Sequence, residues 1–370
     1  MVKHPGYYIR QAMERREWLQ RDLAFILGVP EQSVNLILSG KRNVSPDMAL
    51  ALAAAFDTGR DFFANLQQAY DLAHAHTPDP RVAMRGRMQS RYPVREMTQR
   101  GWISAAGRVP LDDQLMRLFD VRFADEIPYL AGSARRDRYE EREIPPADLV
   151  WSCRVRQIAK SLPSPRYSEP VLRDALVELE KLLLAPDQVR QVPTLLAECG
   201  VRFVVVEKLP RANIDGVCLW LGPDSPVIGI STRRDTIDNF WFVVRHEIEH
   251  VLNGDGKDAE VIDRLDGEQA SATSLPLSEQ ERRANAAAAG FCVPAAKIDS
   301  FMIRHKPHYD EKHVLAFAAA HRRHPGLIVA YMQRHMERSD YMARQLVKVR
   351  NFLLPHAIVD GWGHVAPVSL

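Results

Sequence analysis

Residues 240–252 (FWFVVRHEIEHVL) place two histidines and an intervening glutamate in a largely apolar segment. Residues four positions apart lie one above the other on an α-helix, so His246 and His250 can reach the same ion. The apolar residues around them predict a buried helix over 238–252. Charged side chains in a buried helix need partners or a metal ion, so the segment predicts a metal-binding helix inside a folded domain.

This pattern favours a zinc site with hydrolytic chemistry. Glu247 follows the first histidine and is placed to act as a general base on a water molecule at the metal. The cysteines are widely spaced and form no CxxC pair, so we expect reduced structural thiols at Cys153, Cys199, Cys218 and Cys292. The other ligands must then be histidine or carboxylate, and a catalytic zinc needs a third protein ligand and an open position.

The spacing leaves several candidates for the third ligand. Glu281 opens a predicted helix over 278–289, just after an acidic loop at 254–278. Small residues at 286–290 would let this helix pack closely on the histidine helix. Glu279 is the nearest alternative. Five downstream histidines are further alternatives: His305, His308, His313, His321 and His324.

The first 75 residues predict short helices of a helix-turn-helix bundle. Apolar residues recur at helical spacing on two successive helices, as Leu23, Ala24 and Leu27 and as Val34, Ile37 and Leu38. Gly28 separates the two helices, and Gly40 ends the second. Ser45 is a predicted N-cap before Pro46, and further helices are expected over 48–56 and 61–74.

A helix-turn-helix unit inserts the N-terminal residues of its second helix into the major groove of DNA. Side chains there can read base edges, whereas polar residues near the neighbouring helix ends contact phosphates. The predicted DNA-contacting residues are Gln20, Gln32, Ser33, Asn35, Lys41 and Arg42. A solvated polar helix face is the alternative. The expected partner is double-stranded DNA, and we expect a homodimer because such domains usually read two half-sites.

Net charge limits the affinity expected of this head for DNA. The 370 residues carry 49 Lys and Arg against 47 Asp and Glu, a formal net charge of +2. The chain as a whole therefore lacks the strongly basic balance of many nucleic-acid binders. A dimer or an Arg-rich stretch after residue 80 would have to assist, through Arg81, Arg85, Arg87, Arg91, Arg95, Arg100 and Arg108. A solvated helix face is the alternative for this stretch.

The rest of the chain reads as mixed helix and strand. We expect helices through most of 111–200, with Leu172, Leu176, Leu179 and Leu183 on one buried face. Predicted strands are 201–207, 216–221, 227–231 and, later, 326–331. No apolar run approaches the ~18 residues of a membrane span, and the start lacks a signal-peptide core. We therefore expect a cytoplasmic protein without a membrane partner.

Residues 170–335 resemble the ImmA/IrrE family of zinc metallopeptidases. The resemblance rests on Asp238-x-Phe240-Trp241-Phe242, His246-Glu247-x-x-His250, Glu281-x-x-Ala284-Asn285, Pro294, Ile214-Asp215-Gly216, Pro226-Val227-Ile228 and His324-Pro325-Gly326-Leu327-Ile328-Val329. It implies a zincin-like peptidase with Glu281 as the third ligand. In that family a small residue usually precedes the second histidine, whereas this chain has Glu249. Glu249 is expected to be solvated, paired with arginine, or placed where it narrows the cleft.

Residues 4–75 resemble the HigA-like group of helix-turn-helix domains. The matching residues are His4-Pro5-Gly6, Trp18-x-Gln20-x-x-Leu23-Ala24, Leu27-Gly28-Val29, Ile37-Leu38-x-Gly40-Lys41-Arg42 and Pro46-Asp47-Met48-Ala49-Leu50. Pro93-Val94-Arg95-Glu96-Met97 and Arg100-Gly101-Trp102-Ile103 are similar to the region that connects the two modules in fused proteins.

The predicted fold class is α+β. We expect an all-α helix-turn-helix bundle at 1–76, a helical connector at 77–165, a mostly helical zincin-like domain with a small β-sheet at 166–335, and a tail at 336–370. The expected function is a DNA-binding transcriptional regulator whose zinc endopeptidase cleaves a helix-turn-helix repressor under stress.

Two other functions remain open. The first is an antitoxin-like or ligand-sensing repressor whose metal domain binds without turnover. The second is self-cleavage, with 76–80 as the accessible bond and the loop at 254–278 as a gate; ordinary surface loops are the alternative for both segments.

Overall fold

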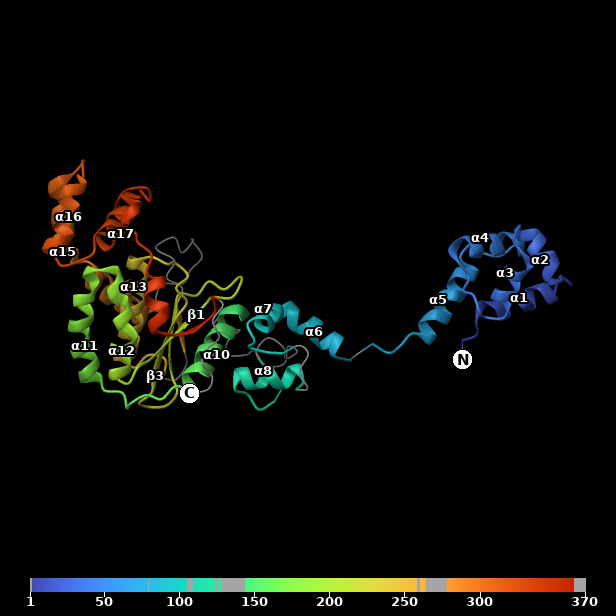
Figure 1. The fold of residues 1–370 in the computed structure, drawn as a ribbon, viewed down its shortest axis with the longest axis horizontal. Helices are drawn as coiled ribbons and strands as arrows, with labels where there is room; N and C mark the ends of the chain where they lie inside the picture. Colours follow the sequence, from blue (N-terminus) through green and yellow to red (C-terminus); the bar gives the residue numbers. More distant parts are fainter. Residues whose placement is uncertain are drawn as a thin grey trace. The chain divides into compact units, whose positions relative to one another are not determined.

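A computed structural model describes residues 2–78, 80–104, 109–123, 126–127, 144–257, 260–263 and 278–362. The chain forms two compact units, Met1–Val82 and Ala83–Leu370, which we describe separately (Figure 1). The predicted boundaries at residues 76, 165 and 335 stay predictions. Of the predicted Arg-rich stretch, Arg108 and the side chains of Arg81, Arg85 and Arg87 lie outside the described residues, as do 258–259 and 264–277 of the acidic loop.

The first unit is an all-helical bundle, as predicted. Its helices are α1 (Pro5–Glu14), α2 (Gln20–Leu27), α3 (Glu31–Leu38), α4 (Pro46–Ala55) and α5 (Phe62–His74). Gly28 ends α2 in the left-handed conformation at φ 64°, which glycine adopts without strain. Ser45 caps α4 by accepting a hydrogen bond from the Met48 amide, with Pro46 at the first helical position, as the sequence predicts.

The core of this unit comes from one face of each helix. The buried side chains include Ile9, Leu23, Val34, Ile37, Leu52, Phe56 and Phe63. Gly6 lies so close to α3 that an added Cβ would stand 2.2 Å from the Ile37 carbonyl oxygen. A larger residue at position 6 would therefore push α1 away from α3.

The second unit is built on a mixed β-sheet. Its strands are β1 (Arg202–Val206), β2 (Gly216–Trp220), β3 (Pro226–Ile230), β4 (Val261–Asp263) and β5 (Ile358–Asp360), in the order β4-β2-β3-β1-β5. The β1 strand runs parallel to β3 and β5, whereas β2 runs antiparallel to β3 and β4. The first three strands were predicted. The fourth lies where the sequence predicts only a loop, and the fifth lies in the predicted tail.

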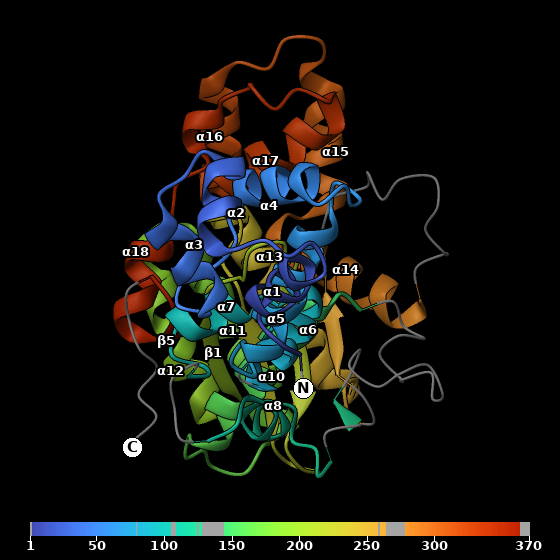
Figure 2. The same cartoon turned by 90° about the vertical axis from the view of Figure 1, so that its right-hand side faces the viewer.

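Helices precede and follow the strands in this unit. The α-helices are α6 (Pro80–Arg91), α7 (Val94–Gln99), α8 (Leu111–Phe119), α10 (Pro146–Lys160), α11 (Glu169–Lys181), α12 (Val192–Glu198), α13 (Ile237–Asn253), α14 (Glu279–Cys292), α15 (Ala295–His305), α16 (Glu311–Ala320), α17 (Pro325–Met336) and α18 (Arg350–Leu353). Short 3₁₀ turns are η2 (Leu182–Leu184), η3 (Pro186–Gln191), η4 (Ala343–Gln345) and η5 (Leu354–His356). In both views α15, α16 and α17 lie together at one end of the unit (Figures 1 and 2).

Alternate residues of the sheet face two different cores. Phe203 and Val205 of β1 pack with α11, α12 and α13 on one side. Val204 and Val206 pack with α10 on the other side (Figure 1). This period-2 pattern, with both faces apolar, explains why the strands read as continuous apolar runs. The α+β class predicted from the sequence is confirmed.

The predicted strand at 326–331 is wrong, because these residues belong to α17. Leu327, Ile328 and Val329 are all buried, so the apolar run shows no helical period. A short continuous apolar run suits a buried strand and a buried helix equally well. Local capping decides the outcome here, because Pro325 occupies the first turn and His324 Nδ1 accepts a hydrogen bond from the Gly326 amide.

Within the described residues, no single helix is long and apolar enough to cross a membrane. One pair of helices, α14 and α15, meets the length and composition test together but is bent by 60° between its two members.

Candidate metal centre

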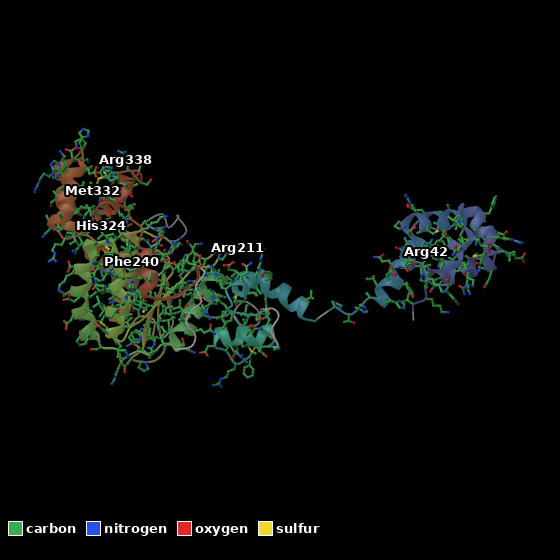
Figure 3. The ribbon with its side chains drawn as sticks, viewed as in Figure 1. Arg42, Arg211, Phe240, His324, Met332 and Arg338 are labelled. Carbon is green, nitrogen blue, oxygen red and sulfur yellow. The ribbon has the colours of Figure 1, made fainter. Side chains whose placement is uncertain are left out.

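The histidine helix α13 spans Ile237–Asn253, one residue longer at each end than predicted. It ends at Gly254, which adopts φ 72° and reverses the chain. His246, Glu247 and His250 are all fully buried on this helix. Phe240, labelled in Figure 3, belongs to the first turns of α13 and is buried in the core of the unit. The two imidazoles are therefore held by a helix that is itself anchored in the core.

The two histidines and Glu281 converge on one point. The Nε2 atoms of His246 and His250 lie 3.0 Å apart. Glu281 places its carboxylate oxygens 3.4 Å from the His246 Nε2 and 3.5 Å from the His250 Nε2. The structure thus brings together the residues that the sequence favours as ligands, with Glu281 from the first turn of α14.

Two local features place Glu281. Ser278 caps α14 and accepts a hydrogen bond from the Glu281 amide at 3.2 Å, which fixes the first turn of the helix. Ala284 and Ala288 are fully buried on the same helix. Their small side chains allow the close packing of α14 on α13 that the sequence predicts.

A fourth group, Asp263, was missed by the sequence analysis. Its Oδ2 lies 3.3 Å from the His246 Nε2 and 3.6 Å from the His250 Nε2, and the residue is 3% exposed. One potential ligand atom from each of His246, His250, Asp263 and Glu281 lies within 4.8 Å of every other. Asp263 ends β4, a three-residue strand inside a segment of several acids, so no local pattern distinguishes it from its neighbours.

Asp255 orients the second histidine. Its Oδ2 lies 2.9 Å from the His250 Nδ1, which turns the Nε2 of that ring toward the centre. The backbone around Asp255 is fixed in turn, because its carbonyl accepts a hydrogen bond from the Trp220 indole at 2.8 Å. Carboxylates in this position commonly set the tautomer and direction of metal-binding histidines.

Glu247 points its carboxylate at the sheet beside this centre. Neither oxygen meets a hydrogen-bond donor among the described residues. Gly216 of β2 provides the space, because a Cβ built there would stand 1.9 Å from the Glu247 Oε1. Burial raises the pKa of Glu247 well above its ordinary value, and the charge of Asp263 raises it further. Glu247 is thus a buried carboxyl whose proton affinity is high.

The charges of the centre favour a bound cation. The pKa of His246 is raised to about 9, since burial lowers it but the carboxylates of Asp263 and Glu281 outweigh burial. The pKa of Asp263 is lowered although burial raises it, because the imidazoles of His246 and His250 lie beside it. Two imidazole nitrogens and carboxylate oxygens that converge in a buried site form a donor set that suits zinc. The residues present therefore fit the predicted ion.

In the first unit, the predicted DNA-contacting residues gather at two helix starts and one turn. Gln32 and Asn35 are exposed on the first turns of α3, and Ser33 between them is half-buried. Lys41 and Arg42 are exposed just beyond α3, where Arg42 (labelled in Figure 3) donates a hydrogen bond to the Ser33 Oγ at 3.4 Å. Gln20 is half-buried at the start of α2.

Each of the two units contains a match to a known family model. Residues 9–63 match the helix-turn-helix family model, and residues 200–324 match the model of the IrrE N-terminal-like domain, a metallopeptidase-like family. The second match contains α13, Glu281 and Asp263. The chain joins a helix-turn-helix domain to an IrrE-like domain.

The curated relatives match a short part of the chain. The chain is 43% identical over 51 residues to the uncharacterized HTH-type transcriptional regulator YbaQ of Escherichia coli K12, and equally to that of Escherichia coli O6:H1. These 51 residues are 14% of this chain and 45% of the relative, so the chain spans about half the length of the curated relatives it matches. An addiction module antidote protein of a HigA family from Coxiella burnetii is 36% identical, over 19% of this chain and 78% of that chain, at a TM-score of 0.18.

The unusual glutamate of the IrrE-like domain, Glu249, lies outside the centre. Its Oε2 accepts a hydrogen bond from Arg245 at 2.8 Å, one helical turn away. Of the readings open to this residue, the structure favours the arginine-paired acid. Glu279 and the downstream histidines considered as alternative third ligands do not belong to the four-residue group.

A cleft of about 630 Å³ borders the centre of the IrrE-like domain. Glu281 and Asp255 line it, together with Lys257 and Glu260. A cleft of this volume has the size of a typical ligand-binding pocket, and it opens beside Glu281. All four cysteines are buried and free, as expected of structural thiols.

Proposed function

We propose that this protein is a DNA-binding transcriptional regulator with a zinc-dependent endopeptidase domain. The observation that carries the proposal is the convergence of His246, His250 and Glu281 beside the buried carboxyl of Glu247. This convergence occurs inside the part of the chain that matches the IrrE-like model. A helix-turn-helix domain in the same chain supports a role in transcription.

His246, His250 and Glu281 would hold the zinc, and Asp255 would keep the His250 ring in place through its Nδ1. When bound, zinc supplies Lewis-acid chemistry at a peptide carbonyl. Glu247 would accept a proton from water at a carboxylate oxygen and deliver it to the leaving amine. Burial raises the pKa of Glu247, and a higher pKa makes its carboxylate a stronger proton acceptor.

The substrate class follows from the two domains together. A peptidase joined to a DNA-reading head can act on proteins that occupy the same DNA, so we propose that the substrate is a helix-turn-helix repressor or the chain itself. Cleavage would then release transcription under stress. The DNA contacts would come from Gln20, Gln32, Ser33, Asn35, Lys41 and Arg42, in a homodimer that reads two half-sites.

The test uses the purified full chain with zinc, alone and with candidate repressors, followed by intact mass. The proposal predicts a zinc-dependent cut that Glu247→Gln abolishes. Glu249→Gln is the matched control, because it removes a carboxyl two residues away that pairs with Arg245, outside the centre. A cut that persists in Glu247→Gln refutes the assigned mechanism.

A second candidate function is regulation without turnover. The presence of Asp263 as a fourth potential ligand at the centre favours it, because saturated four-ligand zinc sites are usually structural. In that case the zinc-loaded chain would shift its own upstream DNA in a gel at low salt, yet cut no protein. Absence of the gel shift at low salt would sink this candidate.

A further inference from the structure

The strand β4 sits at the edge of the sheet and brings Asp263 opposite Gly216. The Asp215 amide donates a hydrogen bond to the Asp263 carbonyl at 2.9 Å, which ties the end of β4 to β2. Gly216 is also the residue whose missing side chain leaves room for Glu247. The carboxylates of Asp263, from β4, and Glu247, from α13, therefore both lie beside Gly216 of the sheet.

The Asp263 carboxylate points into the centre, where its charged neighbours are the two imidazoles. Oδ2 is buried and makes no hydrogen bond among the described residues, although two imidazole nitrogens lie within 3.6 Å of it. A buried carboxylate oxygen that accepts no hydrogen bond is costly. Coordination of a cation shared with His246, His250 and Glu281 would satisfy it.

A buried ion pair fixes the start of β4. Glu260, just before the strand, is paired with Arg156 of α10, and the Glu260 side chain is only 2% exposed. The same helix is tied to β5 through a hydrogen bond from the Arg154 Nε to the Asp360 carboxylate at 2.5 Å. The position of β4 therefore depends on α10, and so does the position of Asp263. The helices α10 and α13 pack on opposite faces of the sheet.

From these contacts we infer that Asp263 is a fourth protein ligand that closes the metal site in the resting protein, held there by the Arg156–Glu260 pair. The inference rests on the metal site of the proposed function. Four protein ligands fill a tetrahedral zinc site, whereas catalysis needs one position open. Turnover therefore requires β4 to withdraw Asp263, so the strand acts as a lock on the peptidase.

The experiment replaces zinc by cobalt(II) in the full chain and follows the visible spectrum while acetohydroxamate is added. Wild type should resist the hydroxamate, because all four positions are filled. Asp263→Ala should bind the hydroxamate at a concentration lower by about 10-fold or more. The same variant should bind zinc more weakly by about 10-fold or more, which is the scale on which metal affinity responds to loss of a supporting group. Glu279→Gln removes an acid from the same first turn as Glu281 and should behave as wild type.

A second variant covers the case in which Asp263→Ala fails to fold. Glu260→Gln keeps the carboxylate at position 263 but weakens the pair with Arg156, so it should bind hydroxamate more tightly than wild type. Equal hydroxamate affinity in wild type and in the folded variants overturns the lock. If wild-type protein binds no cobalt at all, the metal site itself fails, and with it the proposed function.

Discussion

Gly216 is the residue whose substitution tests the placement of Glu247 most selectively. A Cβ at this position would stand 1.9 Å from the Glu247 Oε1 and 2.7 Å from its Cδ. Ordinary contact begins at 3.4 Å, so Gly216→Ala must push the carboxyl away by about 1.5 Å. His246 and His250 flank Glu247 in sequence, and the three atoms nearest to the new methyl group all belong to Glu247.

The expected consequence is a loss of rate without a loss of metal. A misplacement of ~1 Å in a reacting group can cost ~10²-fold in rate, which corresponds to about 2.7 kcal/mol in the barrier. Zinc content should stay unchanged. Alanine is also better than glycine inside a strand by roughly 0.5–1 kcal/mol, which offsets part of the crowding in the melting temperature.

The assay compares kcat/KM on a cleaved protein substrate, zinc content and melting temperature for wild type and Gly216→Ala. Gly222→Ala is the control, because no atom lies within 4 Å of a Cβ built there. If Gly216→Ala keeps full activity with full zinc, Glu247 does not act from the position described here. If it loses zinc and activity together, the residue supports the ligands and not the base.

Three further predictions concern both units. Asp255→Ala should weaken zinc affinity by ~10–100-fold, as measured by competition with a chelator, because it removes the acceptor that orients His250; unchanged affinity contradicts that role. Gly6→Ala should lower the free energy of unfolding of the first unit by ~1–3 kcal/mol in urea, because its Cβ would stand 2.2 Å from a carbonyl oxygen. Gly59→Ala is the control: its Cβ meets no atom within 4 Å, so it should unfold as wild type does. Lys41→Ala should reduce the slope of log binding constant against log salt by about 1 if it contacts a phosphate; an unchanged slope removes it from the interface.

The sequence predicted the parts of the site that depend on one helix at a time. His246, Glu247 and His250 follow from helical spacing, whereas spacing left Glu281 as one of several candidates for the third ligand and the resemblance to the ImmA/IrrE family selected it. Asp263 could not be predicted in this way. Its role depends on β4 pairing with β2, a contact between segments more than 40 residues apart that leaves no periodic signal in three residues.

The strands that could be predicted are those with a local sequence signal, and the strands that were missed depend on pairing with distant segments. The strands β1 and β3 are rich in β-branched residues, and the turn residues 222–224 separate the apolar strand β2 from β3, so each strand is visible locally. The last strand, β5, joins the sheet only through parallel pairing with β1, far away in sequence. The start of α17 was mistaken for a strand because residues 326–330 are all buried and show no amphipathic period.

The central claim is that His246, His250 and Glu281 hold one zinc ion in this chain. Metal analysis of the purified full chain tests it directly, together with His246→Ala and the exposed-histidine control His308→Ala. We predict close to one zinc per chain in wild type and in the control, and almost none in His246→Ala. Zinc that persists in His246→Ala, or its absence from wild type purified without chelators, would contradict the account.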